Sequence, residues 1–150
     1  MNLRAPTMLD HAFILECYEQ WPVTETQGPI TPYEVKLWID RWMNRTDEVC
    51  LIAEIPAKVG LVTWRQNLFV AVIDNIVIHP GVQGRGYGKR LMVALQERLV
   101  GAGVVVAEFD AIPGRVADMV VAGRFERLGE GIGKSGLPIV KGRVMADTEI

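Results

Sequence analysis

The spacing of apolar side chains predicts two helices in the first third of the chain. The first covers residues 8–20, and Thr7 is placed to cap its N-terminus. The second begins after Thr31, which is followed by Pro32 at the first helical position and Glu34 at the third. The apolar positions with helical spacing are Leu9, Phe13, Ile14 and Cys17 in the first helix and Val35, Trp38, Ile39 and Trp42 in the second.

Extended segments dominate the rest of the chain. The expected segments are strands at 2–5, 49–55, 59–65, 71–80 and 103–112, helices at 89–100 and 114–129, and short strands at 129–134 and 137–144. Gly129 is the expected stop of the last helix. A strand–helix–strand crossover inside a largely antiparallel arrangement predicts an α/β fold, with one mixed sheet and helices on both of its faces.

Length and composition agree with one domain over residues 1–150, since 49% of the residues are apolar and 23% are charged. The net charge of −2 gives no overall field that would attract nucleic acid. No apolar run approaches the ~20 residues that span a bilayer, and the N-terminus lacks the layout of a signal peptide. We therefore expect a cytoplasmic protein without a membrane segment. Cys17 and Cys50 do not form a zinc pattern, so we expect free thiols and no metal.

Candidate chemistry is concentrated in the stretch GVQGRGYGKRLM at residues 81–92, which holds four glycines and three cationic side chains. It lies between a predicted strand and a predicted helix. The first N–H groups of a helix have no partner within the helix, and glycine lets a ligand approach the backbone closely. Such a turn binds phosphate. The alternative is a flexible connector with a solvated basic face. The spacing of Gly84, Gly86 and Gly88 does not fit a dinucleotide-binding fingerprint.

Gln83, Gly86 and Gly88 resemble the acetyl-coenzyme A motif of the GCN5-related N-acetyltransferases, the GNAT superfamily, and GRFERLG at 123–129 resembles the end of a later helix of that family. The resemblance implies a GNAT-like, mostly antiparallel sheet that splays open after the fourth strand. It also implies acetyl-coenzyme A as co-substrate. The residues that would contact it are Ile76, Val77 and Ile78 at the strand edge, Gln83, Gly84, Arg85, Gly86, Tyr87, Gly88 and Lys89 at the pyrophosphate, and Asp118 near the pantetheine.

Acetyl transfer to an amine needs an acceptor for the amine's proton and a donor for the leaving thiolate. The resemblance implies Asp74 as the acceptor. Its apolar flanks favour burial, which would make it a useful base; the alternative is a carboxylate that faces solvent or pairs with an arginine. Asn75 is expected on the opposite face of the strand. Phe125 falls at the usual tyrosine of the family and cannot donate a proton, and His79 is more typical of a turn residue than of a catalytic one.

The predicted function is acetyl-coenzyme A-dependent N-acetyl transfer to a primary amine, by direct attack on the thioester in a ternary complex. The alternatives are a non-catalytic acyl-coenzyme A-binding module, favoured by Phe125, and a protein-interaction domain. Trp21 and Glu25 are the candidates to contact a small-molecule or peptide amine, because loops carry specificity. Trp38 and Trp42 are assigned to the core. The sequence does not choose the amine, and a homodimer is among the oligomeric states left open.

Overall fold

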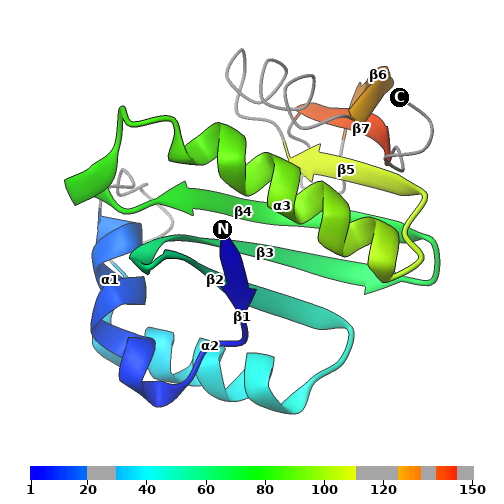
Figure 1. The fold of residues 1–150 in the computed structure, drawn as a ribbon. Helices are drawn as coiled ribbons and strands as arrows, with labels where there is room; N and C mark the ends of the chain where they lie inside the picture. Colours follow the sequence, from blue (N-terminus) through cyan, green and yellow to red (C-terminus); the bar gives the residue numbers. More distant parts are fainter. Residues whose placement is uncertain (20–29, 111–124, 133–137, 145–150) are drawn as a thin grey trace.

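The computed structural model describes residues 1–19, 30–110, 125–132 and 138–144. The described elements are β1 (Asn2–Arg4), the 3-10 turn η1 (Met8–Asp10), α1 (His11–Glu19), α2 (Pro32–Asn44), β2 (Glu48–Ile55), β3 (Ala57–Asn67), β4 (Val70–Ile78), the 3-10 turn η2 (Pro80–Val82), α3 (Tyr87–Gly101), β5 (Val106–Asp110), β6 (Phe125–Ile132) and β7 (Pro138–Val144). Figure 1 shows their arrangement around one twisted sheet.

The described strands form a sheet in the order β1-β2-β3-β4-β5-β7-β6. Strands β4 and β5 pair in parallel, and every other neighbouring pair is antiparallel. The parallel pair follows from the crossover through α3, because a connection between parallel strands must return across the sheet. The predicted mixed and mostly antiparallel sheet is confirmed.

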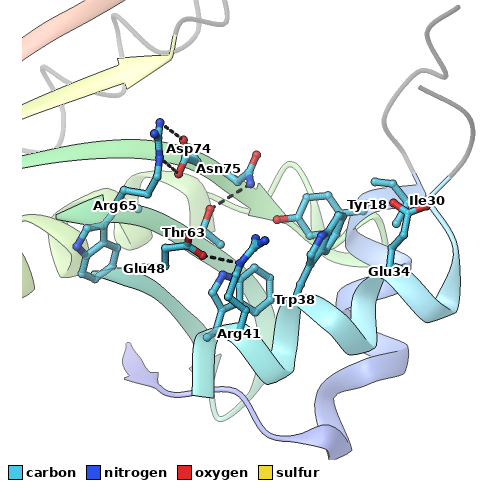
Figure 2. Close-up of a pocket in the computed structure, with 12 residues that line it drawn as sticks. Tyr18, Ile30, Glu34, Trp38, Arg41, Glu48, Thr63, Arg65, Asp74 and Asn75 are labelled. Carbon is cyan, nitrogen blue, oxygen red and sulfur yellow. Dashed lines mark hydrogen bonds and ion pairs between the residues drawn. The ribbon is translucent and has the colours of Figure 1, made fainter. Parts of the chain in front are cut away.

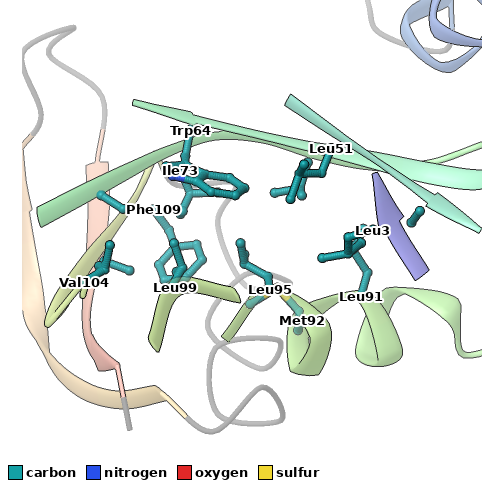
Figure 3. Packing of buried hydrophobic residues seen from close by; sticks show 14 of the residues in the cluster. Leu3, Leu51, Trp64, Ile73, Leu91, Met92, Leu95, Leu99, Val104 and Phe109 are labelled. Carbon is teal, nitrogen blue, oxygen red and sulfur yellow. The ribbon is translucent and has the colours of Figure 1, made fainter. Parts of the chain in front are cut away.

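Helices cover both faces of the sheet, as predicted (Figure 1). Helix α3 packs on one face through Leu91, Met92, Leu95 and Leu99, which meet strand residues such as Phe109 in the larger apolar cluster (Figure 3). Helices α1 and α2 pack on the other face in a second cluster. Its buried members are Ile14, Cys17, Tyr18, Val35, Ile39, Cys50, Ile52, Leu61 and Val77. Both cysteines are buried as thiols, and burial raises the pKa of Cys17 to about 12.

The two predicted helix starts are confirmed in detail. Thr7 and Asp10 form a capping box, in which the Thr7 side chain accepts from the backbone and the Asp10 carboxylate accepts from the Thr7 N–H at 2.8 Å. Thr31 caps α2 by accepting from the Glu34 N–H at 3.2 Å, and Pro32 occupies the first helical position. Each cap involves residues no more than three positions apart, so it can be predicted from a short stretch of sequence.

The predicted helix at 114–129 is wrong at its C-terminal end. Residues 125–129 belong to β6, which pairs antiparallel with β7 from Phe125↔Val144 to Ile132↔Pro138. Gly129 ends no helix; the register shifts between Arg127 and Gly129, as at a β-bulge, where glycine is common. Pairing with a neighbouring strand therefore overrides the apolar spacing that favoured a helix. Residues 114–124 lie outside the described part of the chain.

Candidate active site

The turn between β4 and α3 has an open, glycine-shaped backbone. We call residues 83–89 the glycine turn. Gly84 and Gly86 have φ of +79° and +82°, and a Cβ at either position would meet nothing within 4 Å. Gly86 is the N-cap of the 15-residue helix α3 and provides no side-chain hydrogen bond to it. The first N–H groups of α3 thus lack a side-chain cap at an exposed turn that carries Arg85 and Lys89. This combination suits an anion.

Side chains from α1 and from the residues on either side of η2 hold the start of this connection in place. The His79 Nδ1 accepts a hydrogen bond from the Gly81 N–H at 3.0 Å, so its Nε2 carries the proton and donates to Glu16 Oε2 at 2.6 Å. The imidazole also stacks on Phe13, with ring centroids 5.3 Å apart. Gln83 donates from Nε2 to the Ile78 carbonyl at 3.0 Å. The turn-residue interpretation of His79 is confirmed, and the Gln83 side chain anchors the glycine turn to β4.

The second half of β4 lies beyond its ladder with β5. The two strands pair only from Val70↔Val106 to Ile73↔Phe109 among the described residues, whereas pairing with β3 continues to Ile78. This pairing agrees with the splayed sheet that the family resemblance implied. The side chains of Ile76 and Ile78 pack against the cluster under α3, and Val77 is buried in the cluster under α1 and α2.

A bulge interrupts β4 where the catalytic carboxylate was predicted. Thr63 pairs with Asn75 and Trp64 pairs with Ile73, so Asp74 is an extra residue on β4. Asp74 and Asn75 consequently line the same pocket. The prediction that they point to opposite faces is wrong, because it assumed an uninterrupted alternation of side chains.

A pocket of about 530 Å³ lies between α2 and the sheet, and we call it the α2 pocket (Figure 2). It is lined by Tyr18, Ile30, Glu34, Trp38, Arg41, Trp42, Glu48, Thr63, Trp64, Arg65, Asp74 and Asn75. Arg65 and Asp74 lie at one end and Ile30 and Glu34 at the other, with Trp38 between them (Figure 2). Its volume is in the range of small-molecule sites, roughly 300–1,000 Å³.

Asp74 is about 30% exposed and faces Arg65 with both carboxylate oxygens. The Arg65 Nε and Nη2 each donate to it at 3.0 Å. Of the two alternatives that the sequence left open, the structure has the arginine-paired carboxylate, and a role in proton transfer stays a prediction. Next to it, Asn75 Nδ2 donates to Thr63 Oγ1 at 3.1 Å and the Asn75 side chain also bonds with the Tyr18 hydroxyl. Burial raises the pKa of Tyr18, so this phenol stays protonated.

The model of the acetyltransferase (GNAT) family matches residues 14–129, which is more than half of the chain and includes β4, the glycine turn and α3. The protein belongs to the GNAT family. No curated protein matches the chain in sequence.

Solved GNAT acetyltransferases share the fold at low sequence identity. Aminoglycoside acetyltransferase AAC(6')-Ib in complex with coenzyme A and kanamycin is 20% identical with a TM-score of 0.76, over 99% of this chain and 95% of that one. A chimera of spermidine N-acetyltransferase SpeG from Vibrio cholerae and hSSAT is 16% identical with a TM-score of 0.75, over 96% of this chain and 94% of that one. These likenesses extend along the whole chain and establish a common fold.

Some predicted site residues of this GNAT protein lie outside the described residues, and some residues that line the pocket were not predicted. Trp21, Glu25 and Asp118 lie outside the described residues. Trp38 and Trp42, which were assigned to the core because of their spacing, do pack half-buried against the second cluster, and they also line the α2 pocket. The sequence also gave no reason to select the pocket residues Tyr18, Thr63 and Asn75, although Tyr18 lies one helical turn from the buried Ile14.

Two further findings concern only the described part of the GNAT chain. None of its helices is long and apolar enough to cross a membrane. Within the same residues, no cluster of three or more histidine, cysteine, aspartate or glutamate side chains could hold a metal ion.

Proposed function

We propose that the protein transfers the acetyl group of acetyl-coenzyme A to a small-molecule primary amine. The observation that carries the proposal is that one strand, β4, adjoins both the glycine turn and the α2 pocket. Its C-terminal end leads into the glycine turn, and its bulge at Asp74 opens into the α2 pocket. An anionic donor bound at the turn and an amine bound in the pocket would meet along the half of β4 that lies beyond β5.

The residues of the glycine turn fit a pyrophosphate. Gly84 and Gly86, both at positive φ, have no side chain on the open side of the turn, and the start of α3, which has no side-chain cap, offers N–H donors. Arg85 and Lys89 are exposed at the same turn and would add charge. The amides of a pantetheine arm would pair with β4 as an added strand does with a sheet edge.

The transfer would proceed by direct attack. The amine nitrogen forms a bond to the thioester carbonyl carbon, the C–S bond breaks, and coenzyme A leaves as a thiolate. The nitrogen gives up one proton and the thiolate takes one, so the reaction needs no other reactant. Asp74 would accept the proton of the amine, with Arg65 fixing the orientation of its carboxylate. Alignment of the two reactants on β4 would supply much of the remaining rate.

The similar structures support an amine as acceptor, because one is an aminoglycoside acetyltransferase in complex with coenzyme A and kanamycin and the other is a spermidine N-acetyltransferase chimera. A non-catalytic acyl-coenzyme A-binding module is the second candidate. It is favoured by the pairing of both Asp74 oxygens with Arg65, whereas Phe125 lies in β6 and not at the helix end on which its comparison with the family's tyrosine rested. Release of free thiol in the presence of amines separates the two candidates.

The glycine turn provides a matched test of the donor site. Gly86→Ala places a Cβ over the proposed pyrophosphate, and we expect about tenfold weaker binding of acetyl-coenzyme A by calorimetry. Gly103→Ala is the control, since Gly103 has a φ of +78°, also has nothing within 4 Å of a Cβ, and follows the other end of α3. Equal affinity of the two folded variants would remove the glycine turn as the donor site.

A further inference from the structure

We propose that Asn75 contacts the attacking amine, and that Thr63 and Tyr18 are positioning residues that hold its amide in place. The inference rests on the proposed acetyl transfer and assigns residues to it beyond Asp74. It is carried by the bulge in β4 and by the hydrogen bonds that the Asn75 side chain makes at the α2 pocket.

The bulge in β4 brings two oxygen-bearing side chains to one side of the strand. Without it, Asp74 and Asn75 would alternate between the two faces of the sheet. With it, both line the α2 pocket, and Figure 2 shows them next to each other on β4. A primary amine that approaches this part of the strand therefore meets a carboxylate and a side-chain amide together, and not the carboxylate alone.

Two buried hydroxyls hold the Asn75 amide. Its nitrogen donates to Thr63 Oγ1 at 3.1 Å, and the side chain also bonds with the Tyr18 hydroxyl. Burial raises the pKa of Tyr18 and the bond with Asn75 lowers it in part, as an N–H that donates to the phenol oxygen does. Thr63 and Tyr18 are 4% and 3% exposed, and Tyr18 packs edge-on against Trp38, with ring centroids 5.2 Å apart. The hydroxyls that hold the amide are thus themselves held by the protein.

This arrangement leaves the amide oxygen of Asn75 as the atom that a ligand can use. A side-chain amide has two N–H donors and one acceptor oxygen, and here the nitrogen serves the two hydroxyls. Figure 2 shows the oxygen turned away from Thr63. Since Asn75 lines the pocket, this oxygen is placed to accept an N–H from an amine bound beside Asp74.

A neutral acceptor next to a carboxylate suits an amine that must react in its uncharged form. The uncharged nitrogen has a lone pair for attack on the thioester carbonyl carbon, and the partners of its N–H groups determine where that lone pair points. Asn75 would hold one N–H. Asp74 would take the proton that leaves, directly or through one water, as the N–C bond forms and the C–S bond breaks. A second carboxylate at position 75 would instead stabilise the ammonium ion, which has no lone pair.

The first test uses two small acceptors, hydroxylamine and methylamine, with saturating acetyl-coenzyme A and thiol release above the uncatalysed rate as the readout. At neutral pH hydroxylamine is uncharged, whereas methylamine is a cation. Asn75→Ala should lower kcat/KM for hydroxylamine by about 10–100-fold, because alignment of the nitrogen is lost, with an unchanged dissociation constant of acetyl-coenzyme A. Asn44→Ala is the control, because the Asn44 amide bonds to Asp40 at the end of α2 and does not line the pocket.

Asn75→Asp separates a contact with the amine from a structural role. The carboxylate keeps an acceptor oxygen at the same position, so the rate with hydroxylamine should recover most of the loss that alanine causes. With methylamine the same variant should be about tenfold slower than wild type at neutral pH, because raising the pKa of the amine by one unit lowers its uncharged fraction tenfold. This deficit should shrink as the pH rises. A merely structural role predicts the same deficit for both amines at every pH.

Thr63→Val and Tyr18→Phe test the positioning role, since each removes a hydroxyl and changes the size of the side chain little. Each should lower kcat/KM for hydroxylamine several-fold in the wild-type background. In the Asn75→Ala background each should have little further effect, because the amide that the hydroxyl holds is then absent. Equal losses in both backgrounds would show that Thr63 and Tyr18 act through the fold and not through Asn75.

The outcomes separate this inference from the proposed function. No thiol release above the uncatalysed rate with either amine would refute acetyl transfer and, with it, the role of Asn75. Acceleration by wild type that is equal in Asn75→Ala and Asn44→Ala would refute the role of Asn75 and leave acetyl transfer intact. If Asn75→Ala does not fold, the contrast between the two amines in Asn75→Asp decides the question.

Discussion

Replacing Asp10 should destabilise the protein more than replacing any exposed carboxylate. Asp10 is 1% exposed and joins three segments of chain. Arg4 of β1 donates to its two oxygens at 2.8 and 2.9 Å, Lys58 of β3 approaches at 2.8 Å, and the backbone N–H of Thr7 completes the capping box. These contacts attach the start of α1 to the sheet and so hold the wall of the α2 pocket that contains Tyr18.

The size of the effect follows from which charges are left behind. Removing one partner of a buried ion pair typically costs about 3–5 kcal/mol, because the other charge is then buried alone. The Arg4 and Lys58 side chains are 32% and 33% exposed, so water can solvate them in part once the carboxylate is gone. We therefore expect the lower end, about 3 kcal/mol for Asp10→Asn, whose amide oxygen can still cap Thr7. Asp10→Ala also loses the cap and should cost about 1 kcal/mol more.

Urea unfolding at neutral pH measures this loss. With a slope of roughly 2 kcal/mol per molar urea, the midpoint for Asp10→Asn should fall by about 1.5 M without a change of slope. Asp47→Asn is the control, because the Asp47–Arg45 pair is 3.6 Å long and its side chains are 63% and 52% exposed. This variant should stay within about 0.5 kcal/mol of wild type. A shift for Asp10→Asn no larger than that of Asp47→Asn would refute the reasoning.

The pH dependence provides a second check on Asp10. The Arg4 guanidinium, followed by Lys58 and the Thr7 N–H, holds the pKa of Asp10 well below its usual range. A carboxyl with a lowered folded-state pKa contributes stability above its unfolded pKa of about 3.9 and loses it as the pH falls toward the folded value. The advantage of wild type over Asp10→Asn should be full above pH 5 and shrink steadily below about pH 4. An advantage that stays constant down to pH 2 would contradict this role.

Two further predictions concern catalysis. Asp74→Asn should lower kcat by roughly 10²–10⁴-fold, because only the carboxylate accepts the proton of the amine. The dissociation constant of acetyl-coenzyme A should change little. If steady-state kinetics give an unchanged kcat and an unchanged pH–rate profile, Asp74 has a structural role only. His79→Ala should raise KM for acetyl-coenzyme A several-fold with kcat nearly unchanged, because the imidazole holds the Gly81 N–H and anchors the turn to Glu16. Glu16→Gln keeps an acceptor for His79 and should have the smaller effect; equal KM values for His79→Ala and wild type would exclude the positioning role.

Much of the fold could be predicted because its signals are local. The caps at Thr7 and Thr31 are side chain–backbone hydrogen bonds within three residues, so short sequence patterns contain them. The glycine turn could be found for the same reason, since positive φ at Gly84 and Gly86 depends on the turn itself. The first residues of β6, 125–128, could not, because Phe125 pairs with Val144, 19 positions further along the chain (144 − 125), whereas the rest of β6 falls within the strand expected at 129–134.

The bulge at Asp74 explains why the sequence predicted the position of β4 correctly but placed Asn75 on the wrong face of that strand. Before the bulge, Ala71 and Ile73 face the cluster under α3. With uninterrupted alternation Asn75 would follow them into that apolar cluster, where its amide would need partners that apolar side chains cannot supply. One extra residue reverses the pattern, so Asn75 faces Thr63 and the α2 pocket while Ile76 packs under α3. The bulge thus places two adjacent polar side chains at the pocket and keeps Asn75 out of the apolar cluster under α3. The spacing of apolar residues does not reveal a bulge of one residue. The bulge nevertheless lies on the strand that leads to the proposed donor site, and it turns Asp74 and Asn75 toward the proposed acceptor site.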